Sequence, residues 1–482
     1  MNESFKFIQN SLIHPFTHST IFTHFFAKNK NYTMPQRPPL SVKIMFAIGQ
    51  LGWSLASFGV LNLIPYFYMP PESGKTDFPD FVYQGAVLGI LTVAGLVNFG
   101  GRFFDAISDP IIANLSDKSN SKFGKRKVFL AIGALPFALL SVLIFMPISP
   151  TDTMLNTAWL MGLIVLFYLF FSMYVVPYNA LIGELGHHPK DRMLISTLIS
   201  VTWAVGFVLG GMIYAMQGHF ETTGMTSDKA FQTSQMILSA IAFVCMLFPI
   251  FFLNEKRYCK QTTSSVNFVK SLKIVWANKN FRYFVFSDLT YWIAITIIQT
   301  GVIYYVTILL GMEKEQASLF GVAAFLLSFA MYIPINLAVA KFGKKPVIML
   351  GFVLFAMTFL VSFFLGRIPL PDMVQFGLLI TLSALPMGIF GIIPNAIIAD
   401  IINQEAEEKG ESQAGMFFAF RTFMMKLGAS FALLIFPSLL LLGRSVENDF
   451  GIRLTGLVAL FFCLLGLFLF RKYNDSADSN WE

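Results

Sequence analysis

The stretch "GRFFDAISDP", residues 101–110, places one arginine and two aspartates inside a segment that otherwise suits a membrane. The chain around it is 55% hydrophobic and only 13% charged over 482 residues, which is more apolar than a soluble core requires. A charge at the bilayer centre costs roughly 2.5–3.5 kcal/mol even on lenient scales, so such residues usually face an interior cavity. The stretch therefore predicts a membrane helix with one polar face.

Apolar runs on either side of this stretch define the membrane topology. A helix needs roughly 20 mostly apolar residues to span a bilayer. Dividing the chain at charged, proline and glycine breaks predicts an all-α membrane protein with twelve spans. These are 44–69, 82–116, 128–148, 156–182, 193–216, 235–253, 284–311, 317–340, 346–366, 373–399, 412–442 and 454–470.

The 34 lysines and arginines set the orientation, because basic loops tend to stay cytoplasmic. Most of them fall on one side if both termini are cytoplasmic. Topology then explains the net charge of +7, and no nucleic-acid partner is expected. We predict a multi-pass protein of the plasma membrane, of the bacterial inner-membrane type. The three cysteines offer no extracellular pair for a disulfide.

Two short motifs recur at almost equal separation and indicate an internal repeat. "VVPYNALIGE" (175–184) is echoed by "IIPNAIIAD" (392–400), and "KFGKRK" (122–127) by "KFGKKP" (341–346). The second pair has two explanations, a tight turn at Gly124 and Gly343 or the general abundance of basic residues in cytoplasmic loops. Parallel six-helix repeats are the plan of the major facilitator fold. We therefore predict two six-helix pseudo-repeats around a central cavity.

The predicted organisation has five parts. The polar tail 1–40 is expected to be a disordered cytoplasmic segment, and it lacks the apolar run and cleavage site of a signal peptide. Its histidines are not taken as a metal site, and the sequence leaves open whether translation starts at Met1 or Met34. The other parts are a six-helix bundle (41–253), a basic cytoplasmic linker (254–283), a second bundle (284–470) and a cytoplasmic tail (471–482).

Charge inside the membrane is confined to the second, seventh and eleventh predicted spans. On the second, Asn98, Arg102, Asp105 and Asp109 fall within about 60° of one another on one helical face. Asp105 lies about 18 Å below the cytoplasmic boundary, and Lys426 of the eleventh span about 21 Å below it. Deep opposite charges in the two halves suggest ion pairs that exchange partners across the cavity.

Two aspartates and Arg102 leave a local charge of −1, which one monovalent cation would neutralise. Carboxylates with the Ser108 hydroxyl suit a hard cation, which makes Asp105 and Asp109 metal ligands if the ion is sodium. Protonation of one aspartate would serve equally well, so sodium and proton stay open. The alternative for Arg102 is a packing ion pair with Asp105. In the other half, Arg421 is expected to reach toward the cytoplasmic surface and Asp288 to cap a helix at the interface.

Long passages resemble the glycoside-pentoside-hexuronide:cation symporter family, the melibiose-carrier branch of the major facilitator superfamily. The Asp-Ala-x-x-Asp-Pro segment is the most specific of them. The matching passages are "RFFDAISDPIIANLSDKSNSKFGKRK" (102–127), "VVPYNALIGEL" (175–185) with "DR" (191–192), "NKNFRYFVFSDL" (278–289) and "ADIINQEAEEKGESQAGMFFAFRTFMMKLGAS" (399–430).

The resemblance implies roles for residues of the predicted site. Asp105 and Asp109 correspond to the cation-site acids and Lys426 to a lysine that projects toward that site. Ser108 and Ser172 take the places of a polar ligand and of a hydroxyl in the fourth span.

The chain departs from melibiose carriers at the positions that would bind sugar. Val175 replaces a site aspartate, and Asn179 stands where those carriers have tryptophan. Ser54 and Ser200 stand where they have a sugar-binding aspartate and arginine. Melibiose itself is therefore not the expected substrate.

A sugar site would still have aromatic and polar side chains available, although each one alone is commonly a packing or interface residue. The aromatic candidates are Trp53, Trp203, Trp292, Tyr304 and Tyr305, and the polar candidates are Ser54, Asn179, Ser200 and Gln299.

The leading functional hypothesis is a secondary active transporter that uses a cation gradient to carry a glycoside or related sugar by alternating access. A carrier of another amphiphile, such as a lipid or drug, would keep the fold and the acids. A remote alternative is a prenyltransferase-type enzyme in which "DAISD" would hold magnesium diphosphate. The asparagine expected beside the first aspartate is, however, replaced by Phe104. The sequence contains no nucleotide-binding P-loop, so we expect transport driven by a gradient rather than by ATP hydrolysis. We expect no enzyme activity, no cofactor and no required protein partner.

Overall fold

The computed structural model describes most of the chain. The described residues are 36–72, 78–87, 89–186, 189–259, 275–409 and 414–474. The predicted tail up to residue 35, including Met1 and Met34, lies outside them, as do the middle of the predicted linker and the last eight residues.

The first predicted bundle is built of helices joined by loops. Several begin at a polar cap: the Thr92 hydroxyl accepts from the Gly95 N–H at 3.1 Å, and the Asp152 carboxylate from the Leu155 N–H at 2.9 Å. The helices are α3 (Leu40–Asn62), α4 (Ile64–Tyr68), α5 (Val93–Lys118), α6 (Lys127–Leu143), α7 (Thr153–Leu185), α8 (Pro189–Gly211), α9 (Ile213–Thr222), α10 (Ser227–Phe252) and the short α11 (Glu255–Tyr258).

The second bundle begins where Asn278 caps a helix through the Phe281 N–H, at 2.9 Å. Its first helix ends in a π-helical turn, and its second is bent by 43° where two segments meet. The elements are α13 (Lys279–Tyr304), η1 (Tyr305–Leu309), α14 (Glu315–Ala330), α15 (Tyr332–Phe342), α16 (Lys344–Phe364), α17 (Asp372–Lys409), α18 (Ala414–Leu440) and α19 (Phe450–Arg471).

Most predicted spans coincide with these helices within a few residues. Among the described residues, nine helical segments are long and apolar enough to cross a membrane, and the bent pair α14–α15 makes a tenth. Helix α6 has 17 residues, and the charged helix α5 falls outside that set. The prediction of an all-α membrane fold is confirmed for the described residues, while the count of twelve and the side on which the termini lie stay predictions.

The predicted start of the second span is wrong. It was placed at residue 82, but α5 begins at Val93. Residues 82–92 are apolar, yet their described part is not helical, and Val87 and Leu91 bond to each other across a tight reversal. The Thr92 cap then sets the first turn of α5.

The repeated motifs occupy matching places in the two bundles. Pro177 and Pro394 both lie inside long helices, α7 and α17. The loop glycines Gly124 and Gly343 have φ of +115° and +83°, a conformation that side chains with a Cβ rarely adopt. The interpretation of these loops as tight turns is therefore confirmed.

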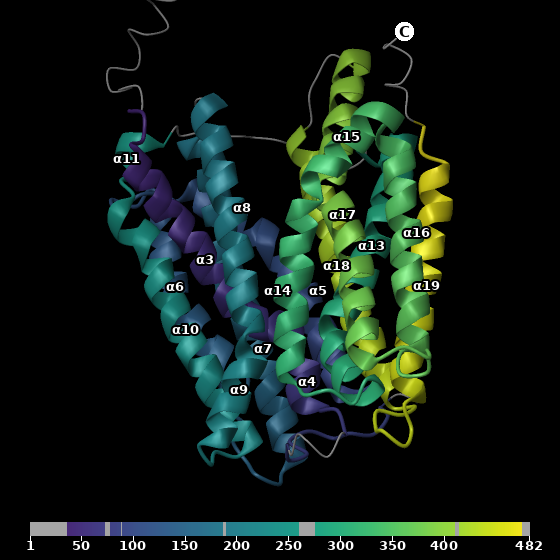
Figure 1. Ribbon diagram of the computed structural model, residues 1–482. Coiled ribbons are helices and arrows are strands. Elements are labelled where there is room, and N and C mark those ends of the chain that lie inside the picture. Colours follow the sequence, from purple (N-terminus) through teal and green to yellow (C-terminus); the bar gives the residue numbers. More distant parts are fainter. Residues whose placement is uncertain are drawn as a thin grey trace, which may run out of the picture.

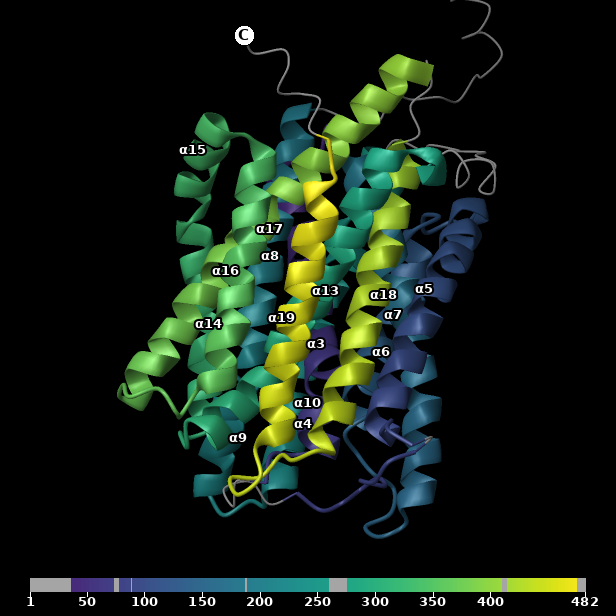
Figure 2. The same ribbon diagram turned by 90° about the vertical axis from the view of Figure 1, so that its right-hand side faces the viewer.

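The two bundles meet along α5 and α18, which lie side by side in Figure 2. The first residues of α3 and the last residues of α19 lie at the same end of the molecule (Figure 1). Under the predicted topology this end is cytoplasmic.

At the opposite end, polar contacts close the seam between the bundles. Lys314 pairs with Glu221, and the Ser318 hydroxyl donates to the Gly211 carbonyl at 2.7 Å. The Tyr304 hydroxyl donates to the carbonyl of Met69 at 2.7 Å. The predicted extracellular side is therefore closed in this structure.

Candidate functional site

The polar stripe of α5 faces α7 and α18 in the middle of the molecule. Asp105 is fully buried, and the Asp109 side chain is 26% exposed. Asn98, almost two turns earlier, is also buried and donates to the Ala94 carbonyl at 3.0 Å. The helical spacing thus delivers both carboxylates to one interior region, as the sequence predicted.

Two serine hydroxyls join the carboxylates. The Ser172 Oγ of α7 lies 2.8 Å from Asp109 Oδ1 and 3.2 Å from Asp105 Oδ1. The Ser108 Oγ lies 2.8 Å from that of Ser172. Two carboxylates and two hydroxyls therefore converge, and oxygen donors of this kind suit a hard cation.

The ammonium group of Lys426 crosses from the other bundle into this cluster. Its Nζ lies 2.5 Å from Asp109 Oδ2, with hydrogen-bond geometry, and 2.7 Å from Asp105 Oδ2. The Lys426 side chain is 11% exposed. A protein-borne cation thus bridges the two carboxylates.

Arg102 stands at the edge of the cluster. Its Nη1 is 3.9 Å from Asp105 Oδ2, too long for a hydrogen bond, and its guanidinium lies over the Tyr168 ring at 5.8 Å. With Lys426 in place, the positive charges of Lys426 and Arg102 balance the negative charges of the two aspartates. Withdrawal of Lys426 would leave a charge of −1.

The two remaining intramembrane charges pair with each other, which corrects two expectations. Arg421 does not reach toward the surface: its Nε and Nη2 lie 2.9 and 3.2 Å from the Asp288 carboxylate. Asp288 is 3% exposed and is not an interfacial cap. Arg421 Nη1 also donates to Asn395 Oδ1 at 2.7 Å. Asp288 and Arg421 lie at similar depth in the seventh and eleventh predicted spans, and this was the signal in the sequence that could have predicted their pairing.

The tryptophan candidates differ in their surroundings. Trp53 packs edge-on against Phe171, and the Lys426 ammonium lies 5.9 Å from the same Phe171 ring. The indole N–H groups of Trp53 and Trp292 are buried and make no hydrogen bond among the described residues. Trp203 is 39% exposed and lies against Phe207 and Phe325.

The tyrosine candidates do not present free ring faces. Tyr304 and Tyr305 are fully buried, and the Tyr305 hydroxyl bonds to Thr455 at 2.8 Å. Since Tyr304 bonds to Met69, both rings serve packing. The expectation that these two rings stack on a sugar is therefore wrong.

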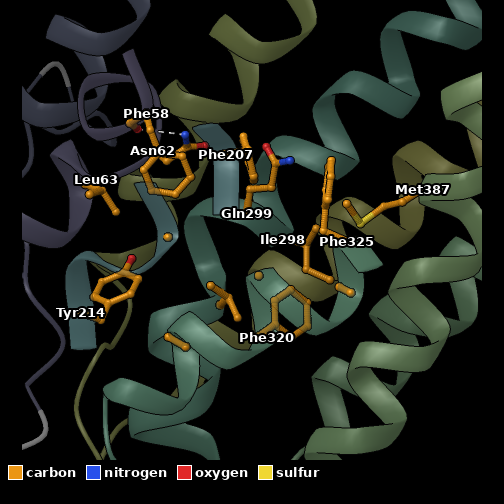
Figure 3. A pocket seen from close by; sticks show the side chains of 15 residues that line it. Phe58, Asn62, Leu63, Phe207, Tyr214, Ile298, Gln299, Phe320, Phe325 and Met387 are labelled. Atoms are coloured by element: carbon orange, nitrogen blue, oxygen red, sulfur yellow. Dashed lines mark hydrogen bonds between the residues drawn. The ribbon is translucent and has the colours of Figure 1, made fainter. Parts of the chain in front are cut away.

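The polar candidates are scattered. Ser54 is buried and donates to the Gln50 carbonyl at 2.8 Å, which leaves no free donor. Ser200 is exposed but donates to the Ser196 carbonyl at 2.9 Å, and Asn179 is exposed. Gln299 is half-buried and lines a cavity between the bundles (Figure 3). Of the predicted substrate residues, Gln299 is the one placed on that cavity.

The sequence reading missed the apolar residues of this cavity. Phe58, Phe207, Phe320, Phe325 and Met387 project into it from four helices (Figure 3). In a chain with 54 phenylalanines, nothing in the sequence distinguishes these from packing residues.

Comparisons with known proteins agree with this architecture. The model of the family described as MFS/sugar transport protein matches residues 45–449. The inner membrane symporter YicJ of Escherichia coli (strain K12) is 25% identical over 337 residues, which cover 68% of this chain and 70% of that protein.

One further relative and one solved structure extend the comparison. The human sodium-dependent lysophosphatidylcholine symporter 1 is 24% identical over 494 residues, covering 93% of this chain and 88% of its own length. The crystal structure of the nucleoside transporter NupG (D323A mutant) superposes with a TM-score of 0.66 at 13% identity. That match covers 90% of this chain and 99% of NupG, and it shows the shared fold alone.

Proposed function

Because the chain belongs to the MFS/sugar transport protein family and is a multi-pass membrane transporter, we propose that it is a secondary symporter. In this proposal a monovalent cation moves down its gradient and carries a glycoside or related sugar with it. Asp105, Asp109, Ser108 and Ser172 form the cation site, and Lys426 couples the site to the opposite bundle.

One observation carries the proposal: the Lys426 ammonium bridges Asp105 and Asp109 across the two bundles. An ammonium is a monovalent cation held by a protein side chain. A group of carboxylate and hydroxyl oxygens that accepts it supplies the charge and the ligands that a free monovalent cation requires.

Alternating access follows from competition for these carboxylates. With the predicted extracellular side closed, Lys426 occupies the site and the local charge is zero. A cation that displaces Lys426 also releases the tie between α5 and α18, so the two bundles can rearrange. Binding of the ion and the conformation of the carrier are then linked, because the ion has higher affinity for the state in which Lys426 is withdrawn.

We expect sodium as the coupling ion, because two carboxylates and two hydroxyls lie within hydrogen-bonding distance of one another. Proton coupling is the alternative, since protonation of one aspartate would also neutralise the −1 charge.

An amphiphile such as a lysophospholipid is a second candidate substrate. It is favoured by the similarity to a lysophosphatidylcholine symporter over 93% of the chain.

The test compares the thermal stability of the purified protein with that of Asp109→Asn in sodium, lithium, potassium and a pH series. Asp372→Asn is the matched control, because Asp372 is an exposed acid in the first turn of α17. An ion that binds the folded state raises the melting temperature by mass action.

Sodium stabilisation of the wild type and Asp372→Asn, but not of Asp109→Asn, would support a sodium site. A pH response that alone separates Asp109→Asn from the others would support proton coupling. Identical responses of all three proteins would exclude Asp109 as a cation ligand.

A further inference from the structure

A small cavity lies between the two bundles, next to the closed seam. It is formed by residues of α3, α8, α9, α13, α14 and α17 and has a volume of about 50 Å³. Gly211 lines it, and the Gly211 carbonyl accepts the hydrogen bond from Ser318 that helps close the seam. The cavity therefore lies where a substrate passing between the bundles would reach the closed end of its path.

Its lining is almost entirely apolar, and its aromatic wall continues outward. Phe58 packs edge-on against Phe207 at 4.9 Å between ring centroids, and Phe207 stacks on Phe325 at 6.2 Å. Trp203 lies 5.5 Å from Phe207 and 5.8 Å from Phe325. Such a surface attracts apolar groups and gives hydroxyl groups few partners.

Two amides interrupt the apolar lining, and they differ in availability. The Asn62 amide donates to the Phe58 carbonyl at 2.9 Å (Figure 3). The side chain of Gln299 makes no hydrogen bond to another described residue, and it is half-buried and lines the cavity. Gln299 can thus bind one polar group beside an apolar one.

The volume limits what the cavity accepts. A cavity of about 150 Å³ encloses benzene, so a cavity about one third of that size holds a short alkyl group or the leading edge of a ring. A long acyl chain does not fit. A fully hydroxylated sugar would leave most of its hydroxyls unpaired against this wall.

We infer that this cavity binds a short apolar substituent of the transported molecule, while the Gln299 amide binds the oxygen that links this substituent to the hydroxylated part. The preferred substrate is then a glycoside with a small alkyl or aryl aglycone. This inference rests on the proposed symport of glycosides and adds the residues that select the aglycone.

Gly321 is a position from which a larger side chain can fill the cavity. It lines the cavity, and a Cβ built on it meets no atom within 4 Å. Gly321→Leu therefore occupies space that the aglycone would use. Gly162→Leu is the matched control, since a Cβ on this exposed glycine of α7 also meets no atom within 4 Å.

The experiment uses the purified full chain in sodium and quenching of its tryptophan fluorescence by 4-nitrophenyl glycosides of the common pyranoses. Trp203 is the expected reporter because it lies against the cavity wall, and Trp203→Phe identifies its share of the signal. Methyl, propyl and octyl glycosides of the same sugar then compete with the nitrophenyl probe.

We expect at least one probe to quench saturably and the propyl glycoside to compete about tenfold better than the methyl glycoside, since it buries two more methylene groups. The octyl glycoside should gain little beyond propyl. Gly321→Leu should reduce the propyl advantage to about twofold or less while competition by the methyl glycoside is unchanged, and Gly162→Leu should behave as wild type.

Three results would overturn the inference. Equal competition by methyl and propyl glycosides would show that the cavity does not bind an apolar substituent. A steady gain in competition from methyl through octyl would indicate a lipid-like substrate. Absence of saturable quenching with every probe, in a protein that sodium still stabilises, rejects the aglycone pocket but leaves the cation site intact. Loss of sodium stabilisation in Asp109→Asn is measured separately and tests the symport proposal itself.

Discussion

At the scale of single residues, the central feature is Lys426, which under the proposed function occupies the place of the transported cation. Lys426 reaches two carboxylates of the opposite bundle at 2.7 and 2.5 Å, and its side chain is largely enclosed. A tethered ammonium lowers the apparent affinity for a free cation, because the ion binds only the fraction of molecules from which the lysine is withdrawn.

Replacing this lysine therefore changes ion affinity in a predictable direction. For Lys426→Gln we expect the sodium concentration that gives half-maximal thermal stabilisation to fall about tenfold, since the competing charge is gone. Transport coupled to the gradient should be lost, because the link to α18 is lost too.

Lys426→Arg is the control, because it keeps the competing charge and should not bind sodium more tightly than the wild type. If Lys426→Gln binds sodium with unchanged or weaker affinity, the lysine does not compete with the ion.

The charged residues of the site were predictable because charges are rare and costly within a membrane. Asp105, Asp109 and Lys426 stand out for this reason, and helical spacing places the two acids on one face. The aromatic lining was not predictable, because Phe58 and Phe325 share their composition and periodicity with the packing residues around them. The burial of Tyr304 was not predictable either, because the sequence does not show which face of α13 other helices cover.

At the scale of elements, α18 carries two cations that serve different bundles. Arg421 and Lys426 are about 140° apart around the helix axis. Arg421 holds Asp288 on α13 within its own bundle, whereas Lys426 reaches α5 of the other bundle. The Arg421–Asp288 pair fixes the rotation of α18 about its axis, and this rotation directs Lys426 toward α5.

Removing Arg421 alone should destabilise the protein strongly. Arg421→Met leaves the 3%-exposed Asp288 without its counter-charge, and an unpaired buried charge costs about 3–5 kcal/mol. We expect a clear fall in melting temperature in detergent.

The double variant Arg421→Met/Asp288→Leu should recover much of the loss, because an apolar pair of similar volume replaces both charges. Equal melting temperatures for the single and double variants would show that the pair does not carry the stability assigned to it.

A loop glycine gives a second prediction at this scale. Gly124 has φ of +115°, and a Cβ on it would lie 2.3 Å from Glu255 Oε2. Glu255 also accepts from the backbone N–H groups of Arg126 and Lys127, so it is not free to move. Gly124→Ala should therefore lower the free energy of unfolding by about 1–2 kcal/mol or more.

Gly183→Ala is the matched control for the measured melting temperature. Gly183 lies within α7 with no atom near its built Cβ, so alanine should stabilise by about 0.5–1 kcal/mol. A neutral Gly124→Ala would mean that the loop adjusts without strain.

The existence and order of the helices were largely predictable, because each apolar run is about as long as a bilayer is thick. The first turn of α5 was not, since residues 82–92 are apolar without being helical, and hydropathy does not distinguish a buried loop from a span. The bend between α14 and α15 also has no hydropathy signal, because both segments are apolar.

At the scale of the whole molecule, the fold was predictable from the repeat. The conformation was not, because alternating states share one sequence and one set of helices. What identifies the state is the set of contacts between the bundles at the predicted extracellular end, where Lys314 is 4% exposed and pairs with Glu221.

This seam predicts how the population of states responds to one side chain. Glu221 also accepts from the Gln217 amide at 3.1 Å, so Lys314→Gln removes a charged bond from a partly enclosed network. A hydrogen bond to a charged group contributes about 1.5–3 kcal/mol, so the ratio of open to closed molecules on this side should rise at least about tenfold.

Spin labels on cysteines at Thr223 and Leu370, in a background without the native cysteines, measure the distance between the bundles at this end. Lys229→Gln is the control, because Lys229 contacts Gln232 within its own helix and should leave the distance distribution unchanged. A Lys314→Gln distribution that matches the control would show that the seam is held by its neutral contacts, with Ser318 and Tyr304 as the groups to vary next.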